Sequence, residues 1–255
     1  GKTALLRQIS LGLGRAGHGR SAFRVDATGI RRCIHLSLEV QQAGDGILMQ
    51  LLTLNRDLAR LFAATPAAVE HQISSEWFEL ERPGGRCPGC EGRGEVVHRL
   101  EYVEDLLVLC PECEGRRFRE EVLVVTIRGA SMDDLLEMTV AEAARFLHRE
   151  QRLHAILQVA DANGLGSCRL SASVRELDDL QILRAVLAGF GGRADRRDLF
   201  IVERPGAGED ANGALQLNRA LRRLTARGAT VIATHAAAVT PATADWLLCM
   251  ERSEG

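Results

Sequence analysis

The sequence predicts an α/β fold in which a parallel sheet with crossover helices is split by a long insertion. Its last third alternates continuous apolar stretches at 198–202 and 230–234 with an amphipathic helical period at 211–227. Strands buried on both faces are apolar throughout, and helices alternating with them are typical of a parallel sheet. A Gly-Lys-Thr start to a helix and two Cys-x-x-Cys pairs in mid-chain complete the outline.

Length and composition limit the class of protein. The chain has 255 residues, 46% of them hydrophobic, which is enough for a sizeable core in one or two domains. No apolar stretch reaches the roughly 18 residues that a membrane helix needs, and no signal peptide opens the chain. A net charge of −2 gives no global attraction to nucleic acid. Three scattered cysteines in apolar contexts favour a reducing, cytoplasmic setting.

The first residues match the end of a phosphate-binding loop. Gly1, Lys2 and Thr3 precede an amphipathic helical start at 4–9. In such loops the lysine neutralises the β- and γ-phosphates, the hydroxyl ligates magnesium and the helix N-terminus faces the anion. Three residues alone are a weak signal. Because the chain begins in mid-motif and without Met, we expect it to be part of a longer protein.

The middle of the chain is predicted to be mainly helical. Residues 46–64 carry apolar side chains at helical spacing. We predict strands at 77–80 and 121–127, which are rich in aromatic or β-branched residues. Ser131 and Thr139 are expected to cap helices, with Glu142 completing a capping box. Further elements are expected as short strands near 23–25 and 246–249, and as helices at 132–137, 140–148, 151–162 and within 164–190.

Two Cys-x-x-Cys pairs form the strongest motif. Cys87 and Cys90 are separated from Cys110 and Cys113 by 19 residues. Each pair places two thiolates on a tight turn, and two such turns together form a tetrahedral four-sulfur site that suits Zn²⁺. The spacer is predicted to be a hairpin, with strands at 95–103 and 106–109. The alternative is two buried or disulfide-linked pairs.

The order of these signals resembles a known family. Gly1-Lys2-Thr3, the four-cysteine module and a terminal βαβ unit with residues 200–205 and Thr234-His235 together resemble the second ATP-binding half of UvrA, the damage-sensing ABC-type ATPase of bacterial nucleotide excision repair. The resemblance covers nearly the whole chain and is tightest over 84–146. It implies an ABC-type P-loop nucleotide-binding domain, with residues 1–64 as its first part and 196–255 as its second. Residues 65–195 would be an insertion that contains the zinc module (87–113) and a helical signature region.

The ATPase motifs depart from the family's pattern. The family's Leu-Ser-Gly-Gly-Glu corresponds to residues 177–181, where Asp178 and Asp179 should repel a phosphate. The family's Leu-Asp-Glu-Pro corresponds to residues 202–205. There Glu203 is a candidate magnesium ligand, but Arg204 stands in place of the catalytic glutamate, and a guanidinium cannot act as a general base.

These departures bear on whether the chain is an enzyme. By resemblance, Gly1, Lys2 and Thr3 would bind ATP with Mg²⁺, and His235 would be the switch histidine. Ala27 stands at the family's Q-loop glutamine. We therefore expect ATP hydrolysis to be weak or lost, and the question of enzyme activity stays open.

The resemblance also implies partners. Duplex DNA would be contacted by arginines close to the cysteines, and such side chains can bind phosphates bidentately. The candidates are Arg93, Arg99, Arg116, Arg117 and Arg119. Acidic residues are interleaved with them, so the alternative is a solvated surface. A second copy or a like ATPase half, and a UvrB-like helicase, are the other implied partners.

Two other readings stay open. One is a scaffold or regulatory paralogue that does not hydrolyse ATP and binds DNA or a partner protein. The other is a zinc-containing peptide-binding module, because Cys87-x-x-Cys90-x-Gly92-x-Gly94 also resembles one repeat of the DnaJ cysteine-rich domain. Such domains carry four repeats. Here there are two, and the second has Arg117 in place of its last glycine.

Overall fold

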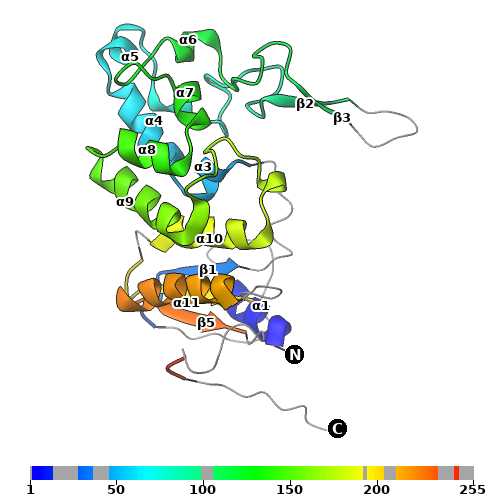
Figure 1. The fold of residues 1–255 in the computed structure, drawn as a ribbon, viewed down its shortest axis with the longest axis vertical. Helices are drawn as coiled ribbons and strands as arrows, with labels where there is room; N and C mark the ends of the chain where they lie inside the picture. Colours follow the sequence, from blue (N-terminus) through cyan, green and yellow to red (C-terminus); the bar gives the residue numbers. More distant parts are fainter. Residues whose placement is uncertain are drawn as a thin grey trace. The chain divides into compact units, whose positions relative to one another are not determined.

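The structure is a computed structural model that describes residues 2–13, 28–36, 46–98, 106–191, 194–203, 211–234 and 244–246. It divides into two compact units (Figure 1). The sheet unit comprises Gly1–Ala43 and Asp178–Gly255, and the cysteine unit comprises Gly44–Leu177. The domain boundaries at 64/65 and 195/196 were expected from the resemblance to the family. The division into compact units does not test them, so they stay predictions.

The sheet unit contains three parallel strands in the order β1-β4-β5. They are β1 (Arg32–Leu36), β4 (Asp198–Val202) and β5 (Thr230–Ala233). Every residue of β4 is buried, as expected for a central strand of a parallel sheet. The predicted parallel sheet is therefore confirmed. The sequence did not predict β1, which carries polar residues among its apolar ones.

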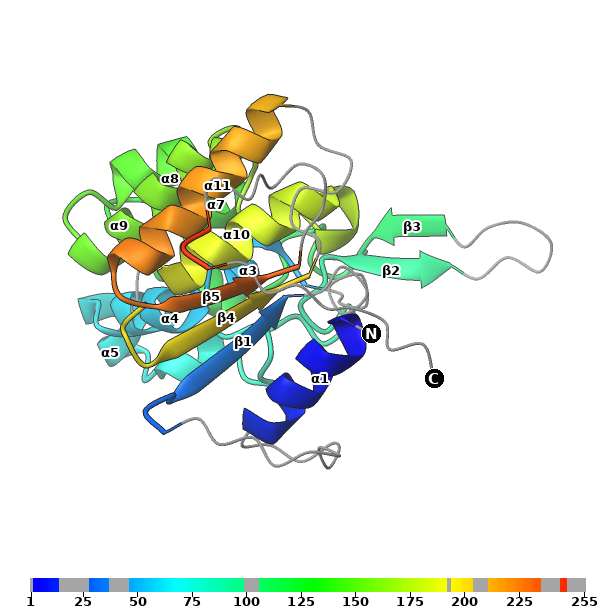
Figure 2. The same cartoon turned by 90° about the horizontal axis from the view of Figure 1, so that it is seen from below.

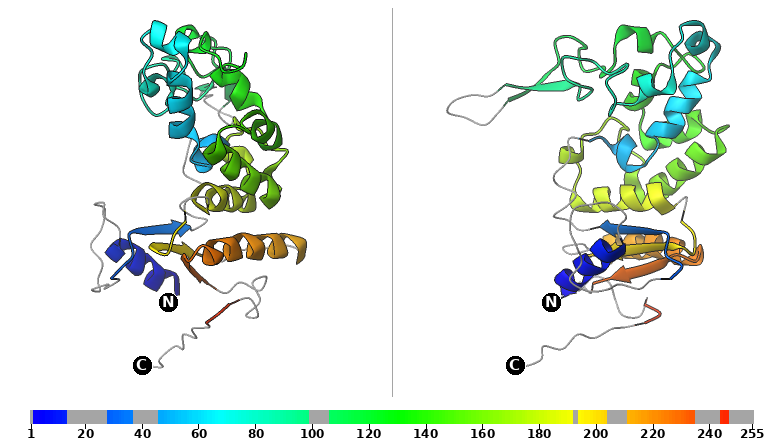
Figure 3. Two further views of the ribbon diagram at one scale, coloured as in Figure 1. Left: turned by 90° about the vertical axis from the view of Figure 1, so that its left-hand side faces the viewer. Right: turned by 180° about the vertical axis from the view of Figure 1, so that it is seen from behind.

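Helices lie on both faces of this sheet (Figure 2). Helix α1 (Lys2–Leu13) packs Leu6 against Leu199 and Ile201 on one face. Helix α11 (Ala211–Ala226) lies on the other face, packed against α10 (Asp179–Gly191). In Figure 3 α1 and α11 again lie on opposite sides of the strands. The predicted strands at 23–25 and 246–249 lie outside the described residues, apart from Trp246.

The cysteine unit is mainly helical and carries a two-stranded hairpin. The hairpin pairs β2 (Glu95–His98) with β3 (Leu106–Leu109) in antiparallel register, as predicted for these parts of the spacer. The other elements are short. They are α3 (Leu48–Leu51), α4 (Asn55–Ala63), α5 (Pro66–Glu70), η1 (Ser75–Phe78), α6 (Glu120–Leu123), α7 (Met132–Glu137), α8 (Val140–Phe146), α9 (Gln151–Ala160), η2 (Asp161–Leu165) and η3 (Val174–Glu176).

Two predicted strands in this unit are wrong. Residues 75–78 form a 3-10 helix that buries Phe78, with its ring centroid 5.5 Å from that of Phe62. The segment 121–127 begins with α6, and it buries Val122 and Val125 while Val124 is 55% exposed. Burial three residues apart is the helical pattern rather than the alternation of a strand. β-branched composition was therefore misleading here.

The helix predicted over 46–64 is two helices, α3 and α4. The chain turns between them at Thr53, which has a φ of 55°. The predicted caps of the next helices are confirmed. Ser131 accepts from the backbone N–H of Asp134, and Thr139 accepts from that of Glu142, at 3.2 Å each. None of the helices in the described ranges is long and apolar enough to cross a membrane.

Candidate metal centre

Four cysteine sulfurs converge in the cysteine unit. The Sγ atoms of Cys87, Cys90, Cys110 and Cys113 all lie within 4.8 Å of one another, and all four residues are buried. Cys87 and Cys110 are 3.9 Å apart, and Cys90 and Cys113 are 3.7 Å apart. A disulfide would require an S–S distance of about 2.05 Å, so the disulfide-linked alternative is wrong. Tetrahedral zinc with bonds of about 2.3 Å requires sulfurs about 3.8 Å apart, which fits.

The two cysteine turns have the same backbone geometry. After Cys90 the chain takes positive φ at Glu91 (53°) and Gly92 (83°). After Cys113 it repeats this at Glu114 (51°) and Gly115 (89°). We call these turns knuckle 1 (Cys87–Gly94) and knuckle 2 (Cys110–Arg117). Their likeness gives a four-sulfur site built from two equivalent halves.

Each knuckle also completes the hydrogen bonds of the other. The backbone N–H of Cys87 donates to the carbonyl of Arg117 at 2.8 Å, and that of Cys110 donates to the carbonyl of Gly94 at 2.9 Å. Within knuckle 1, the N–H of Gly94 donates to the Cys90 Sγ at 3.2 Å. N–H donors that point at sulfur stabilise a thiolate, which is the form that binds metal.

Burial and hydrogen bonding shift the thiol pKa values in opposite directions. Burial raises the pKa of Cys87, and it raises the pKa of Cys113 to about 12. Burial also opposes the Cys110 thiolate, but hydrogen bonds from the N–H groups of Cys113 and Glu112, together with those from the Cys113 and Cys87 thiols, lower the Cys110 pKa. Four buried thiolates need a cation among them, because buried charges are otherwise costly. Sulfur donors at this spacing fit Zn²⁺.

The hairpin extends from the knuckles and carries apolar side chains. Val96 on β2 packs against the cysteine cluster. The opposite face of the hairpin includes Val97, Leu107 and Leu109, which are 45%, 47% and 66% exposed.

Three of the predicted DNA-contacting arginines are engaged within the module. The Nε of Arg93 donates to the Cys90 carbonyl at 3.2 Å, and that of Arg116 donates to the Cys113 carbonyl at 3.3 Å. Arg116 also pairs with Glu120 at 2.9 Å. Arg117 donates to the carbonyl of Arg93, and at 3.2 Å to that of Ser171.

The other two predicted arginines differ from these. The side chain of Arg119 is exposed, and Arg99 lies outside the described residues. The structural role of Arg117 was missed from the sequence. The one signal in the sequence was that Arg117 replaces the last glycine of knuckle 2. The structure gives Arg117 a φ of 67°, close to the 80° of Gly94 at the equivalent position of knuckle 1.

The residues predicted for nucleotide binding lie in the sheet unit. Figure 2 shows the first turn of α1, which includes Lys2 and the exposed Thr3, at the end toward which the strand arrows point. Glu203 follows β4 at this same end, and its Oε1 is 2.7 Å from the His35 Nε2. The carboxyl end of the sheet therefore has a carboxylate and the N-terminus of a 12-residue helix. These two groups fit a magnesium nucleotide. Gly1, Arg204 and His235 lie outside the described residues.

Asp178, the first of the two acidic residues at the signature position, has a local role. The side chain of Asp178 accepts from the N–H of Gln181 at 2.7 Å, and the Gln181 side chain accepts from the N–H of Asp178 at 2.9 Å. This reciprocal pair caps the start of α10. Sequence reasoning assigned Asp178 only a repulsive effect on nucleotide and missed this cap.

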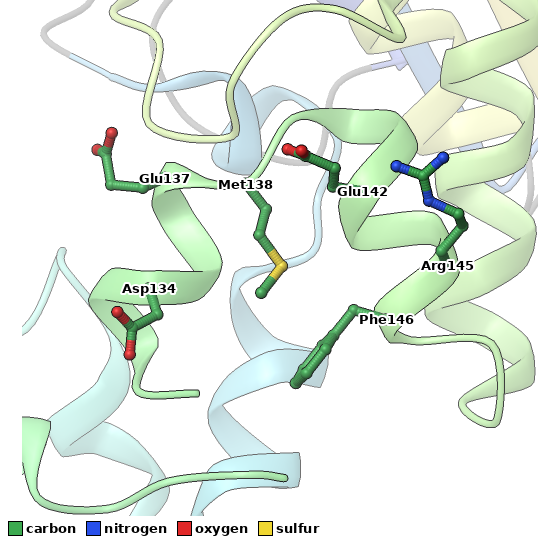
Figure 4. Close-up of a pocket in the computed structure, with 6 residues that line it drawn as sticks. All are labelled: Asp134, Glu137, Met138, Glu142, Arg145 and Phe146. Carbon is green, nitrogen blue, oxygen red and sulfur yellow. The ribbon is translucent and has the colours of Figure 1, made fainter. Parts of the chain in front are cut away.

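A shallow pocket in the cysteine unit has a volume of about 610 Å³. Figure 4 shows Met138 and Phe146 directed toward each other within it, with carboxylates around them. Those carboxylates are engaged by the fold: Asp134 and Glu142 complete the two capping boxes, and Glu137 pairs with Arg169 at 2.6 Å. The pocket therefore offers no free catalytic carboxylate.

Comparison with known proteins gave no matching family model. The chain is 33% identical over 193 residues to "UvrABC system protein A" of Thermus thermophilus, which covers 75% of this chain and 20% of that protein. It is 31% identical over 188 residues to the protein of the same name in Bradyrhizobium diazoefficiens, covering 73% and 19%. The crystal structure of UvrA2 from Deinococcus radiodurans matches with a TM-score of 0.76 and 28% identity, covering 93% of this chain and 29% of that one. The chain thus spans about a fifth of the length of these two curated relatives.

Proposed function

The chain belongs to the UvrA family, and from that premise we propose that it is a zinc-stabilised, DNA-binding half of an ABC-type ATPase that takes part in damage recognition in nucleotide excision repair. The four-cysteine centre carries this proposal. It lies in a unit separate from the parallel sheet, and its sulfur spacing suits a structural metal. Zinc would hold the knuckles together and neutralise the thiolates, with no open position for catalysis.

Duplex DNA is the proposed ligand of the cysteine unit. Arg119 is exposed beside knuckle 2 and is the best-placed candidate for a phosphate contact. The guanidinium groups of Arg93, Arg116 and Arg117 have partners inside the module, so they would contribute less, and Arg99 remains a proposal from sequence. Since each lost phosphate contact lowers the salt dependence of binding by about one unit, these contributions can be measured separately.

ATP and Mg²⁺ are the proposed ligands at the carboxyl end of the parallel sheet. Gly1, Lys2 and Thr3 would bind the phosphates, Glu203 would ligate magnesium, and His235 would be the switch residue. Arg204 replaces the general base, and loss of such a base typically costs about 10²–10⁴ in rate. We therefore propose that hydrolysis is weak or lost. If Arg204→Ala does not change ATP turnover in the full-length protein, Arg204 does not limit hydrolysis.

Pairing with a second copy or a like ATPase half, and engagement of a UvrB-like helicase, are further parts of the proposal. So is a cytoplasmic location. It is supported by the six cysteines of the described residues, none of which forms a disulfide, since reduced cysteines persist in reducing compartments.

A second candidate function is a scaffold that binds DNA or a protein without turnover. The Asp178 cap favours the scaffold. Asp178 stabilises the start of α10 at the position where the family's signature motif approaches a phosphate, and its negative charge would disfavour a phosphate there. The DnaJ-like reading is weakest, since the second of only two repeats ends in Arg117.

The experiment that tests the proposal is binding of the zinc-loaded protein to labelled duplex DNA over a salt series, before and after chelation, with an unfolded peptide as competitor. Binding that weakens with salt and is lost with the zinc supports the proposal. Binding only to the peptide would support the DnaJ-like reading. If neither binds, zinc has a purely structural role and the proposed DNA contact is wrong. For an arginine variant such as Arg119→Ala, Arg60→Ala is the matched control, because Arg60 is an exposed arginine on α4 and belongs to neither knuckle.

A further inference from the structure

A histidine and a glutamate meet at the carboxyl end of the parallel sheet. In the β1–β4 register, His35 lies opposite Ile201. Glu203 is two residues further along, so its side chain projects from the same face as that of Ile201. The His35 Nε2 and the Glu203 Oε1 are 2.7 Å apart, and the two side chains are only 14% and 9% exposed. The contact joins residues 168 positions apart in sequence.

The backbone around Glu203 is fixed as well. Its N–H donates to the carbonyl of Leu36 at 2.9 Å, which continues the β1–β4 ladder one step beyond the end of β4. The next strand is held in the same way, since the N–H of Thr234 donates to the carbonyl of Val202 at 3.1 Å. The glutamate therefore starts from a rigid position, and its side chain is the part that still needs orientation.

The pair lies on the face of the sheet that α1 covers. Leu6 of α1 is buried against Leu199 and Ile201, with Cys33 packed on the same cluster. Residues 33 and 35 of β1 point to the same face, as do residues 199, 201 and 203 of the β4 segment. The imidazole and the carboxylate are therefore on the side where the first turn of α1, with Lys2 and Thr3, begins (Figure 2).

We propose that His35 is a positioning residue for the divalent cation of the bound nucleotide, a role that rests on the proposed nucleotide site. A carboxylate can only accept hydrogen bonds, so the Nε2–H of His35 donates a hydrogen bond to the Oε1 of Glu203. Glu203 has one more rotatable bond than the aspartate of the family's motif, and the imidazole removes that freedom. Partners that orient ligating carboxylates typically change metal affinity by about 10- to 100-fold.

The test measures Mn²⁺ affinity by electron paramagnetic resonance in the full-length, zinc-loaded protein with a non-hydrolysable ATP analogue. We expect His35→Ala to weaken Mn²⁺ binding by about 10- to 100-fold. His35→Gln should recover most of it, because its amide N–H can replace the Nε2 donor. His71→Ala is the matched control, since His71 is an exposed histidine in the cysteine unit. Unchanged or tighter Mn²⁺ binding in His35→Ala overturns the proposal.

A second measurement covers the case in which His35→Ala fails to fold. In a Glu203→Asp background the shorter side chain no longer needs the imidazole, so adding His35→Leu, which removes the donor but fills the space, should change Mn²⁺ affinity by less than about twofold. A larger additional loss would overturn the proposal, as would an absence of Mn²⁺ binding in the unsubstituted protein. Duplex binding is measured separately, so its failure would overturn the proposed function without altering this result.

Discussion

Arg117 provides the sharpest prediction, because it combines an unfavourable backbone conformation with two side-chain hydrogen bonds. Its φ of 67° is in the left-handed region that favours glycine. Its guanidinium donates to the carbonyls of Arg93 and Ser171 and so connects knuckle 2 to knuckle 1 and to the segment before η3. Replacing it with alanine removes the hydrogen bonds and keeps the strain, whereas glycine removes both.

The magnitudes follow from these two contributions. Hydrogen bonds from a charged donor contribute about 1.5–3 kcal/mol each, and the partial exposure of this side chain brings the pair to about 2 kcal/mol in total. Relief of the positive φ by glycine returns about 1 kcal/mol. We therefore expect Arg117→Ala to lower the free energy of unfolding by about 2 kcal/mol. For Arg117→Gly we expect a loss of about 1 kcal/mol.

Urea unfolding at saturating zinc measures this difference. Gly94→Ala is the matched control, because Gly94 occupies the equivalent position in knuckle 1 with a φ of 80° and a Cβ there would lie 2.9 Å from the carbonyl of Gly115. Equal losses for Arg117→Ala and Arg117→Gly would refute the strain argument. Losses below about 0.5 kcal/mol in both would refute the connecting role as well.

Four further predictions concern the metal, DNA, the core and acid stability. Cys90→Ala should abolish zinc binding, seen as a loss of metal by atomic absorption, because three thiolates leave the tetrahedron open. Arg119→Ala should reduce the salt slope of duplex binding by about one unit. Phe78→Ala should lower the free energy of unfolding by about 3–5 kcal/mol in urea, since the ring is fully buried. Hydrogen bonds from Ser131 lower the pKa of Asp134 in the folded protein. The ionised Asp134 therefore stabilises the fold above its unfolded pKa of about 4, and this stabilisation is lost as the pH falls through its lower folded pKa. Asp134→Asn should flatten that part of the acid-unfolding curve.

Each of these has a clear contrary outcome. Full zinc content in Cys90→Ala would mean that another residue completes the site. An unchanged salt slope would remove Arg119 from the DNA-contacting surface. A core loss below about 1 kcal/mol would mean that the cavity left by Phe78 collapses. An acid-unfolding curve for Asp134→Asn that matches the unsubstituted protein would show that the capping box does not contribute.

The sequence was informative where local pattern and spacing decide the structure. Strand β4 and the capping box of Thr139 follow from neighbouring residues, and the cysteine site follows from two turns of fixed spacing. The segment at Val122 was predicted wrongly, because β-branched residues favour strands but here the buried positions recur at helical spacing. The contact between His35 and Glu203 could not be predicted, since it depends on the register of strands that are distant in sequence.

The mutual hydrogen bonding of the two knuckles has a consequence for how the metal enters. Neither knuckle has a complete set of backbone partners alone, because the N–H of Cys87 needs knuckle 2 and the N–H of Cys110 needs knuckle 1. A metal ion bound by only one pair of thiolates would therefore be coordinated by an incompletely folded turn. Loading should be cooperative and pass from empty to full without a populated two-sulfur intermediate. For the same reason, a chelator cannot remove the ion one knuckle at a time while the module stays folded.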